Sequence, residues 1–126
     1  MQNLYLVKRT GDPGHGFGGG TYWDIFEQGK KGRLGFVGHR RDDEGDYWAE
    51  VYVEPRARGR GVAVAAEKLL ADKLGAPRMW AYIAEGNKVS EKAHKRGGYN
   101  RVGTIYLRRF RRRSRPQARG IKAMKI

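Results

Sequence analysis

Apolar and polar residues follow two different periods along the chain, and the first half shows mainly the period of strands. Four short segments alternate apolar with polar positions or are rich in β-branched and aromatic residues, which predicts strands. They are Asn3 to Arg9, Thr21 to Gln28, Arg33 to Arg41 and Tyr47 to Val53. The turn-like sequences GKKG and DDEGD separate the last three segments, so we expect an antiparallel meander.

A helical period replaces this pattern from Gly61 to Leu74. Counted from Val62, apolar residues recur 3, 4, 7, 8 and 12 positions later, which places them on one face of a helix. Gly75 and Pro77 follow, as is typical of a helix end. We therefore predict an amphipathic helix after the four strands.

The rest of the chain predicts two further strands around a second helix, and a short closing strand. Arg78 to Ala84 alternates as a strand does, Asn87 is a suitable N-cap for a helix that ends at Gly97, Tyr99 to Phe110 again suggests a strand, and IKAMKI ends the chain. The order β, loop, β-β-β, α, β, α, β, β predicts an α/β fold on a mixed, mostly antiparallel sheet with two main helices. The loop in this order, GDPGHGFGGG, holds six glycines in ten residues and is expected to be flexible.

Composition limits the class of protein. A length of 126 residues suits one domain, residues 1–126, and no apolar run is long enough to cross a bilayer. No secretory signal is visible, so a cytoplasmic protein is expected. Cysteine is absent, and the three histidines are too far apart in sequence to suggest a shared metal, so metal catalysis is not expected.

The formal net charge of +14 is concentrated near the C-terminus. Residues 108–126 hold nine Lys or Arg and no acidic residue, whereas residues 1–107 hold 18 basic and 13 acidic side chains. Such a block attracts nucleic acid through counterion release, or it is simply a solvated basic surface. Both interpretations stay open.

The junction between the fourth strand and the first helix carries the clearest chemistry. Gly59 and Gly61 permit a tight turn and the close approach of a ligand, and the N–H groups of the first helical turn point together in front of it. The helix dipole adds roughly half a positive charge there, and Arg56, Arg58 and Arg60 add full charges. The segment predicts a diphosphate site; the alternative is a basic turn without a ligand. A GxxxxGK[ST] loop and a three-glycine dinucleotide fingerprint are both absent.

These residues resemble the signature of a known family. Arg56 to Gly61 is similar to the R/Q-x-x-G-x-G/A motif of the GNAT superfamily of N-acetyltransferases, Val53-Glu54-Pro55 to the end of their fourth strand, and Leu69-Leu70 to the following helix. A second motif, N-x-x-A/S-x-x-x-Y followed by G-F or G-Y, resembles the run that contains Asn87, Ser90, His94 and Gly98-Tyr99. The resemblance extends from about Tyr47 to Tyr99 and to the element order.

The resemblance implies acetyl-CoA as cosubstrate and a direct transfer of its acetyl group to an amine. It places the pyrophosphate on the amides of Arg58 to Val62, the pantetheine near Val51 to Val53 and Tyr82 to Ala84, and Asn87 beside the pantetheine arm. The expected cofactor-binding residues are Val51, Val53, Arg56, Arg58, Gly59, Arg60, Gly61, Val62, Asn87 and Ser90.

The catalytic residues that the resemblance implies match the family less closely than the cofactor-binding residues do. Where the family often has a tyrosine acid this chain has His94, whose reference pKa of about 6.5 suits proton donation. Tyr99 is an alternative donor, and the acid step is absent in a further alternative. For the base, Glu50 comes first because it lies on the opposite strand face from Val51 and Val53; Asp46, Glu85 and a bound water are the other candidates.

The expected size of the acceptor is inferred from the glycine loop, Thr10 to Gly20. By the resemblance, this loop stands where GNAT folds place helices over the acceptor site. An open cleft suits a protein N-terminus, a lysine side chain or an RNA-linked amine; a loop that orders on binding predicts nearly the same sequence. The prediction is an N-acetyltransferase, monomeric or homodimeric, without membrane contact. Its alternatives are a nucleic-acid or ribonucleoprotein binding module, with Tyr106 and Phe110 among the arginines of the basic segment, and a GNAT domain that binds CoA without turnover.

Overall fold

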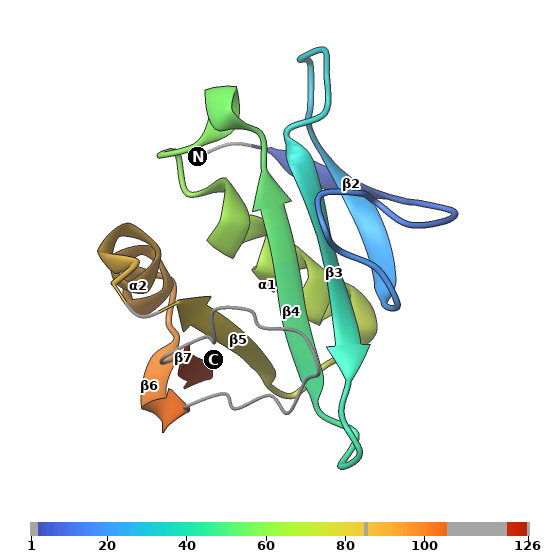
Figure 1. The fold of residues 1–126 in the computed structure, drawn as a ribbon. Coiled ribbons are helices and arrows are strands. Elements are labelled where there is room, and N and C mark those ends of the chain that lie inside the picture. Colours follow the sequence, from blue (N-terminus) through green and yellow to red (C-terminus); the bar gives the residue numbers. More distant parts are fainter. Residues whose placement is uncertain (1–2, 85, 106–120, 126) are drawn as a thin grey trace, which may run out of the picture. The chain divides into compact units, whose positions relative to one another are not determined.

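The computed structural model describes residues 3–84, 86–105 and 121–125 (Figure 1). The chain groups into two compact units, Met1–Met79 and Trp80–Ile126, and each is described by itself. The prediction of a single domain stays a prediction. In the residues described, no helix is both long and apolar enough to cross a membrane.

The first unit is an antiparallel meander with one helix behind it, as the strand and helix periods predict. Each strand pairs antiparallel with the next one in the chain. Figure 1 shows α1 lying behind the strands. The elements are β1 (Leu4–Lys8), β2 (Thr21–Glu27), β3 (Gly35–Arg41), β4 (Tyr47–Val53) and α1 (Val62–Leu74).

One face of this sheet packs against α1 and forms the core. Ile25 and Val37 of the strands and Leu70 of the helix are fully buried there. The side chains of Val51 and Val53 pack against the same cluster. Because side chains alternate along a strand, the residues between them lie on the other face.

We call that other face the loop face; it holds Tyr22, Phe36, Glu50 and Tyr52. The glycine loop has no helix, as predicted, but it is not an isolated excursion. The ring of Phe17 meets Phe36 edge-on with centroids 5.1 Å apart, and Phe36 is fully buried. Residues 15–18 thus cover part of this face. Two aromatic side chains anchor this segment, whereas its glycines alone had predicted no anchor.

The second unit has three strands and one helix. β7 lies between β5 and β6 and pairs antiparallel with both, so the predicted closing strand is confirmed as an interior strand. The predicted strand Tyr99 to Phe110 begins as expected, and its part from residue 106 lies outside the described residues. The elements are β5 (Met79–Ala84), α2 (Lys88–Arg96), β6 (Asn100–Ile105) and β7 (Ile121–Lys125).

The fold class is therefore confirmed. Strands and helices follow one another in the predicted order, the strand pairs within each unit are antiparallel, and two helices longer than one turn occur in the described residues.

Candidate functional site

The turn between β4 and α1 is shaped by two glycines in the left-handed region. After β4 a single 3₁₀ turn, Pro55–Ala57, is anchored by the fully buried Ala57. Gly59 then has φ 80° and Gly61 has φ 76°, values that side chains other than glycine rarely adopt. A Cβ atom at either position would meet nothing within 4 Å, so the space in front of the turn is open.

Helix α1 begins without a side-chain cap. Gly61 is the N-cap, and the first helical hydrogen bond is donated by the Ala65 amide to the Gly61 carbonyl at 3.1 Å. The amides of residues 62–64 therefore have no helical acceptor, as at any helix start. The Arg58 amide instead donates to the Pro55 carbonyl at 3.3 Å. Within the expected range of Arg58 to Val62, the Arg58 amide is therefore already used by the turn.

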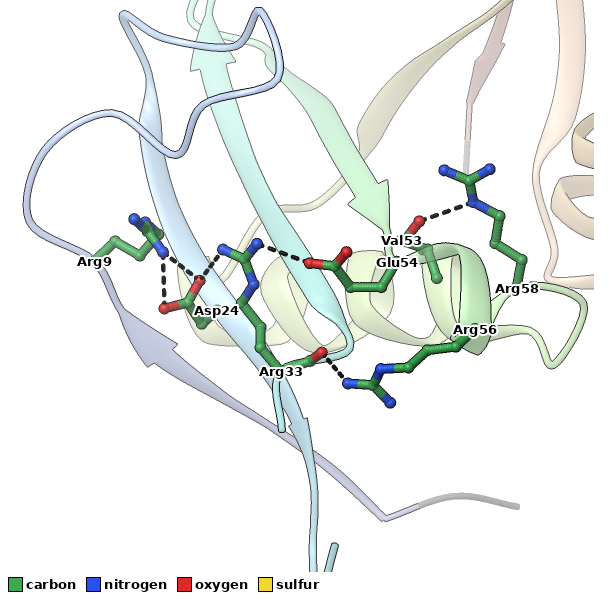
Figure 2. Close-up of polar contacts among 7 residues, drawn as sticks. All are labelled: Arg9, Asp24, Arg33, Val53, Glu54, Arg56 and Arg58. Atoms are coloured by element: carbon green, nitrogen blue, oxygen red, sulfur yellow. Dashed lines mark hydrogen bonds and ion pairs between the residues drawn. The ribbon is translucent and has the colours of Figure 1, made fainter. Parts of the chain in front are cut away.

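Two of the turn's arginines are bound to backbone carbonyls at neighbouring strand ends (Figure 2). Arg56 donates from Nη2 to the carbonyl of Arg33 at 2.6 Å. Arg58 donates from Nε to the carbonyl of Val53 at 2.9 Å. Neutral carbonyls do not cancel a positive charge, and Arg56 is also attracted to Glu54, so both guanidinium groups, Arg58 above all, still favour an anion at the turn.

The third arginine, Arg60, is partly balanced. Its Nη2 lies 3.6 Å from Oε1 of Glu27, and its side chain remains 43% exposed. An exposed pair at this distance is weak, typically about 0–1 kcal/mol, so a phosphate would compete for this guanidinium.

A chain of ion pairs supports the start of the turn (Figure 2). Asp24 accepts from Arg9 at 2.8 Å and from Arg33 at 3.3 Å. Arg33 also donates to Glu54 at 2.8 Å. This hydrogen bond lowers the pKa of Glu54 and raises that of Arg33. Glu54 immediately precedes the turn, so the chain of charges ties the turn to β2 and β3.

Val51, Val53 and Val62 present only backbone to a ligand. The side chain of Val62 is buried, and those of Val51 and Val53 pack against the core. Contacts of these three expected cofactor-binding residues would therefore run through N–H and C=O groups.

Glu50, the first candidate base, lies on the loop face as predicted, and both of its oxygens have donors. Arg40 donates from Nε to Oε2 at 2.9 Å, and the Tyr22 hydroxyl makes a short hydrogen bond to Oε1. Burial, and secondarily Glu50, raises the pKa of Tyr22. Each carboxylate oxygen has a second lone pair, so these two bonds still leave Glu50 able to accept a proton from an amine. The other candidate in this unit, Asp46, is paired with Arg78 at 2.9 Å.

Tyr22 is a residue that the sequence did not single out. Its ring lies across Gly38, where a Cβ atom would come within 2.3 Å of the ring and 2.4 Å of the Thr21 carbonyl. Gly38 stands opposite both Tyr22 and Glu50 in the sheet register. The sequence could have indicated Tyr22 only through Gly38, a glycine that faces the acid Glu50 on the next strand. Recognising that pair requires the register of the strands, which the sequence alone does not give.

In the second unit, α2 brings together the residues of the second motif. Asn87 is the N-cap as predicted, accepting from the Ser90 amide at 3.2 Å. Nδ1 of His94 lies 2.7 Å from the Ser90 carbonyl, which can only accept, so the hydrogen bond requires a proton on Nδ1. His94 is 4% exposed and meets Tyr99 edge-on at 4.8 Å. Glu85, the remaining candidate base, lies outside the described residues.

A match to a protein-family model shows which family this chain belongs to. The model described as the acetyltransferase (GNAT) family matches residues 6–99, which include both motifs. The chain belongs to the GNAT acetyltransferase family. No curated protein matches this GNAT chain.

Solved structures share the fold of this GNAT chain. An acetyltransferase of the family from Bordetella pertussis has a TM-score of 0.61 at 18% identity, covering 84% of this chain and 64% of its own. A spermidine N-acetyltransferase from Vibrio cholerae, in complex with CoA and spermine, has a TM-score of 0.67 at 15% identity, covering 85% and 64%. A dodecameric form of the spermidine enzyme has a TM-score of 0.66 at 15% identity, covering 85% and 64%. The chain thus spans 64% of the length of these proteins.

Proposed function

We propose that this GNAT chain is an acetyl-CoA-dependent N-acetyltransferase. The turn Arg56 to Gly61 carries the proposal, because two left-handed glycines open the space in front of an uncapped helix start. Amides of the first helical turn and the arginine charges suit a diphosphate. An anion at a helix N-terminus is typically stabilised by about 0.3–1 kcal/mol from the dipole alone, so the arginines must supply much of the affinity.

The backbone of β4 near Val51 and Val53 is proposed to contact the pantetheine arm. Asn87 and Ser90 of the second unit are proposed contacts in their own right. Asn87 uses its Oδ1 as a helix cap, which leaves its amide NH₂ group as the donor for such a contact.

The chemistry would be a direct attack of the acceptor nitrogen on the thioester carbonyl. The new C–N bond forms, the C–S bond breaks, the nitrogen loses a proton to a base, and the departing thiolate gains one. Glu50, or a water beside it, is the proposed base. His94, as the doubly protonated imidazolium, is the proposed acid and would donate from Nε2, because Nδ1 donates to the Ser90 carbonyl; Tyr99, in ring contact with His94, is the alternative.

The acceptor is proposed to be a primary amine on a macromolecule. The similar enzymes from Vibrio cholerae are named for spermidine. A polyamine would need carboxylates without partners. On the loop face, however, Asp24, Glu50 and Glu54 are each bonded to an arginine. This pairing favours an acceptor of lower charge density, such as a protein N-terminus.

A nucleic-acid binding role rests on charge alone, because the segment from Arg108 to Arg119, with Tyr106 and Phe110, lies outside the described residues. Binding of CoA without turnover is the other alternative. A single domain, a cytoplasmic location and a monomeric or dimeric state remain parts of the proposal.

Release of free CoA thiol tests turnover. Purified chain is incubated with acetyl-CoA and a panel of peptides with free N-termini, lysine peptides, aminoacylated RNA and spermidine. We expect thiol release with an amine on a macromolecule, and none from the same peptides after N-acetylation. CoA binding without thiol release from any amine would contradict the transfer function and favour a chain without turnover.

A further inference from the structure

Three segments of the first unit meet on the ring of Tyr52. From the glycine loop, the His15 ring stacks on it with centroids 4.0 Å apart and planes 15° from parallel. From the turn, the Arg58 guanidinium carbon lies 5.7 Å from the ring centroid. Phe36 of β3 packs beside it at 5.5 Å. One side chain therefore contacts both the loop and the proposed pyrophosphate turn.

The loop is held down by a small number of contacts. In the described part of the chain, its internal backbone hydrogen bond runs from the Phe17 amide to the Gly14 carbonyl at 3.0 Å. The Gly18 carbonyl accepts from Nη2 of Arg40 and lies 3.2 Å from the Tyr22 hydroxyl, whose proton is used in the bond to Glu50. The rings of His15 and Phe17 add two further contacts.

The backbone conformation of His15 makes its position on Tyr52 dependent on tertiary contacts. His15 has φ 54°, the one positive φ among the described residues that are not glycine. This conformation is unfavourable for a side chain and is kept when tertiary contacts hold it. Loss of the stack on Tyr52 would therefore loosen the part of the loop around His15.

Arg58 is the group that an anion at the turn would move. Its guanidinium lies against an aromatic face and donates to a neutral carbonyl, both weaker partners than a phosphate. An anion that draws this guanidinium away removes one of the contacts that fix the Tyr52 ring.

We propose that Tyr52 is a positioning residue that couples the turn to the glycine loop. Binding of CoA at the turn, which rests on the proposed function, withdraws Arg58 from the ring and loosens the seat of His15, so that the loop face opens for the acceptor. By reciprocity, a chain whose loop is already unseated binds CoA more tightly. An exposed cation–π contact sets the size of the coupling at about two- to fivefold.

Proton NMR of the histidine rings follows the seat directly. In the wild type the stacked ring of Tyr52 shifts the His15 signals upfield, and Tyr52→Leu is expected to return them to unstacked values, while Tyr52→Phe retains the shift. Arg58→Gln without ligand, and CoA with the wild type, should each move His15 toward its Tyr52→Leu position. His39, which stacks on Trp23 at 5.8 Å on the core face, is the internal reference.

Calorimetry with CoA gives the reciprocal result. We expect Tyr52→Leu to bind CoA about two- to fivefold more tightly than the wild type, and Tyr52→Phe to match the wild type. CoA binding with unmoved His15 signals, or equal affinity of Tyr52→Leu and the wild type, would overturn the coupling alone. A wild type that binds no CoA would overturn the proposed function and the coupling together.

Discussion

The buried His94 and the partly buried His39 matter for different properties, His94 for chemistry and His39 for stability. The hydrogen bond from Nδ1 of His94 to the Ser90 carbonyl keeps a proton on Nδ1, so His94 can act as an acid only when Nε2 carries a second proton. His39 stacks on Trp23 and meets Tyr47 edge-on, and in the described residues its Nδ1 has no hydrogen-bond partner. Each leads to a separate measurement.

His94→Gln tests the acid step. If His94 protonates the departing thiolate, kcat should fall about 100-fold or more, the usual range for a general acid, while CoA affinity stays unchanged. Steady-state kinetics with calorimetry measure both. Tyr99→Phe is the companion variant, and a loss confined to it would move the role from His94 to Tyr99. Wild-type kcat in both variants would remove the acid step from the mechanism.

His39 should make stability depend on pH. Burial first, and Arg41 second, lower its pKa below the ordinary value of about 6.5, against an opposing effect of Glu50. As pH falls below about 6.5 the unfolded chain binds the proton first, so the free energy of unfolding falls until the folded pKa is reached. Urea unfolding from pH 7.5 to pH 5 should show this slope, and His39→Phe should flatten it. An equal slope in both proteins would contradict the assignment.

At the scale of elements, local pattern predicted most of the fold. β4 has the predicted bounds, and α1 starts one residue after the predicted Gly61, because apolar spacing and flanking glycines are local signals. β3 starts at Gly35 instead of the predicted Arg33. Gly35 lies so close to β4 that a Cβ atom on it would be 2.0 Å from the Tyr52 carbonyl oxygen. The Tyr22–Glu50 contact and the seat of the glycine loop were not predicted, since both depend on residues brought together by strand register.

Gly38→Ala should disrupt the packing between β2 and β3. The added Cβ would meet the Tyr22 ring at 2.3 Å and a backbone oxygen at 2.4 Å, so we expect a loss of about 1–3 kcal/mol in the free energy of unfolding. Gly18→Ala is the matched control, because its Cβ would meet only the side chain of Asp12, at 3.3 Å. Urea unfolding compares the two, and equal stability of the variants would show that the ring does not depend on Gly38.

At the scale of the whole molecule, the order of the strands and helices and the net charge of +14 need separate tests. The element order was predictable from the sequence, and so was the closing strand. The place of β7 between β5 and β6 was not, because it depends on pairing across a long connection. This placement changes how the basic segment should be tested, since truncation after Leu107 would also remove an interior strand.

Charge substitution avoids that problem. Arg111, Arg112 and Arg113→Gln should leave thermal unfolding and CoA affinity unchanged, because the substitutions spare β7 and the turn. If the segment contacts phosphates, RNA affinity should fall and its dependence on salt should become about two units shallower on a log–log plot. Fluorescence anisotropy at several salt concentrations measures this. Unchanged, salt-insensitive RNA binding, or none in the wild type, would contradict a nucleic-acid role.

Calorimetric titration of CoA into Gly59→Glu tests the turn itself. Gly29→Glu is the matched control: Gly29 has φ 79° against 80° for Gly59, and a Cβ atom at either meets nothing within 4 Å. Backbone strain and added charge are therefore equal. We predict that the wild type and Gly29→Glu bind one CoA per chain with equal affinity, and that Gly59→Glu binds at least about tenfold more weakly. No binding to the wild type, or equal binding to all three proteins, would contradict a pyrophosphate site at Arg56 to Gly61.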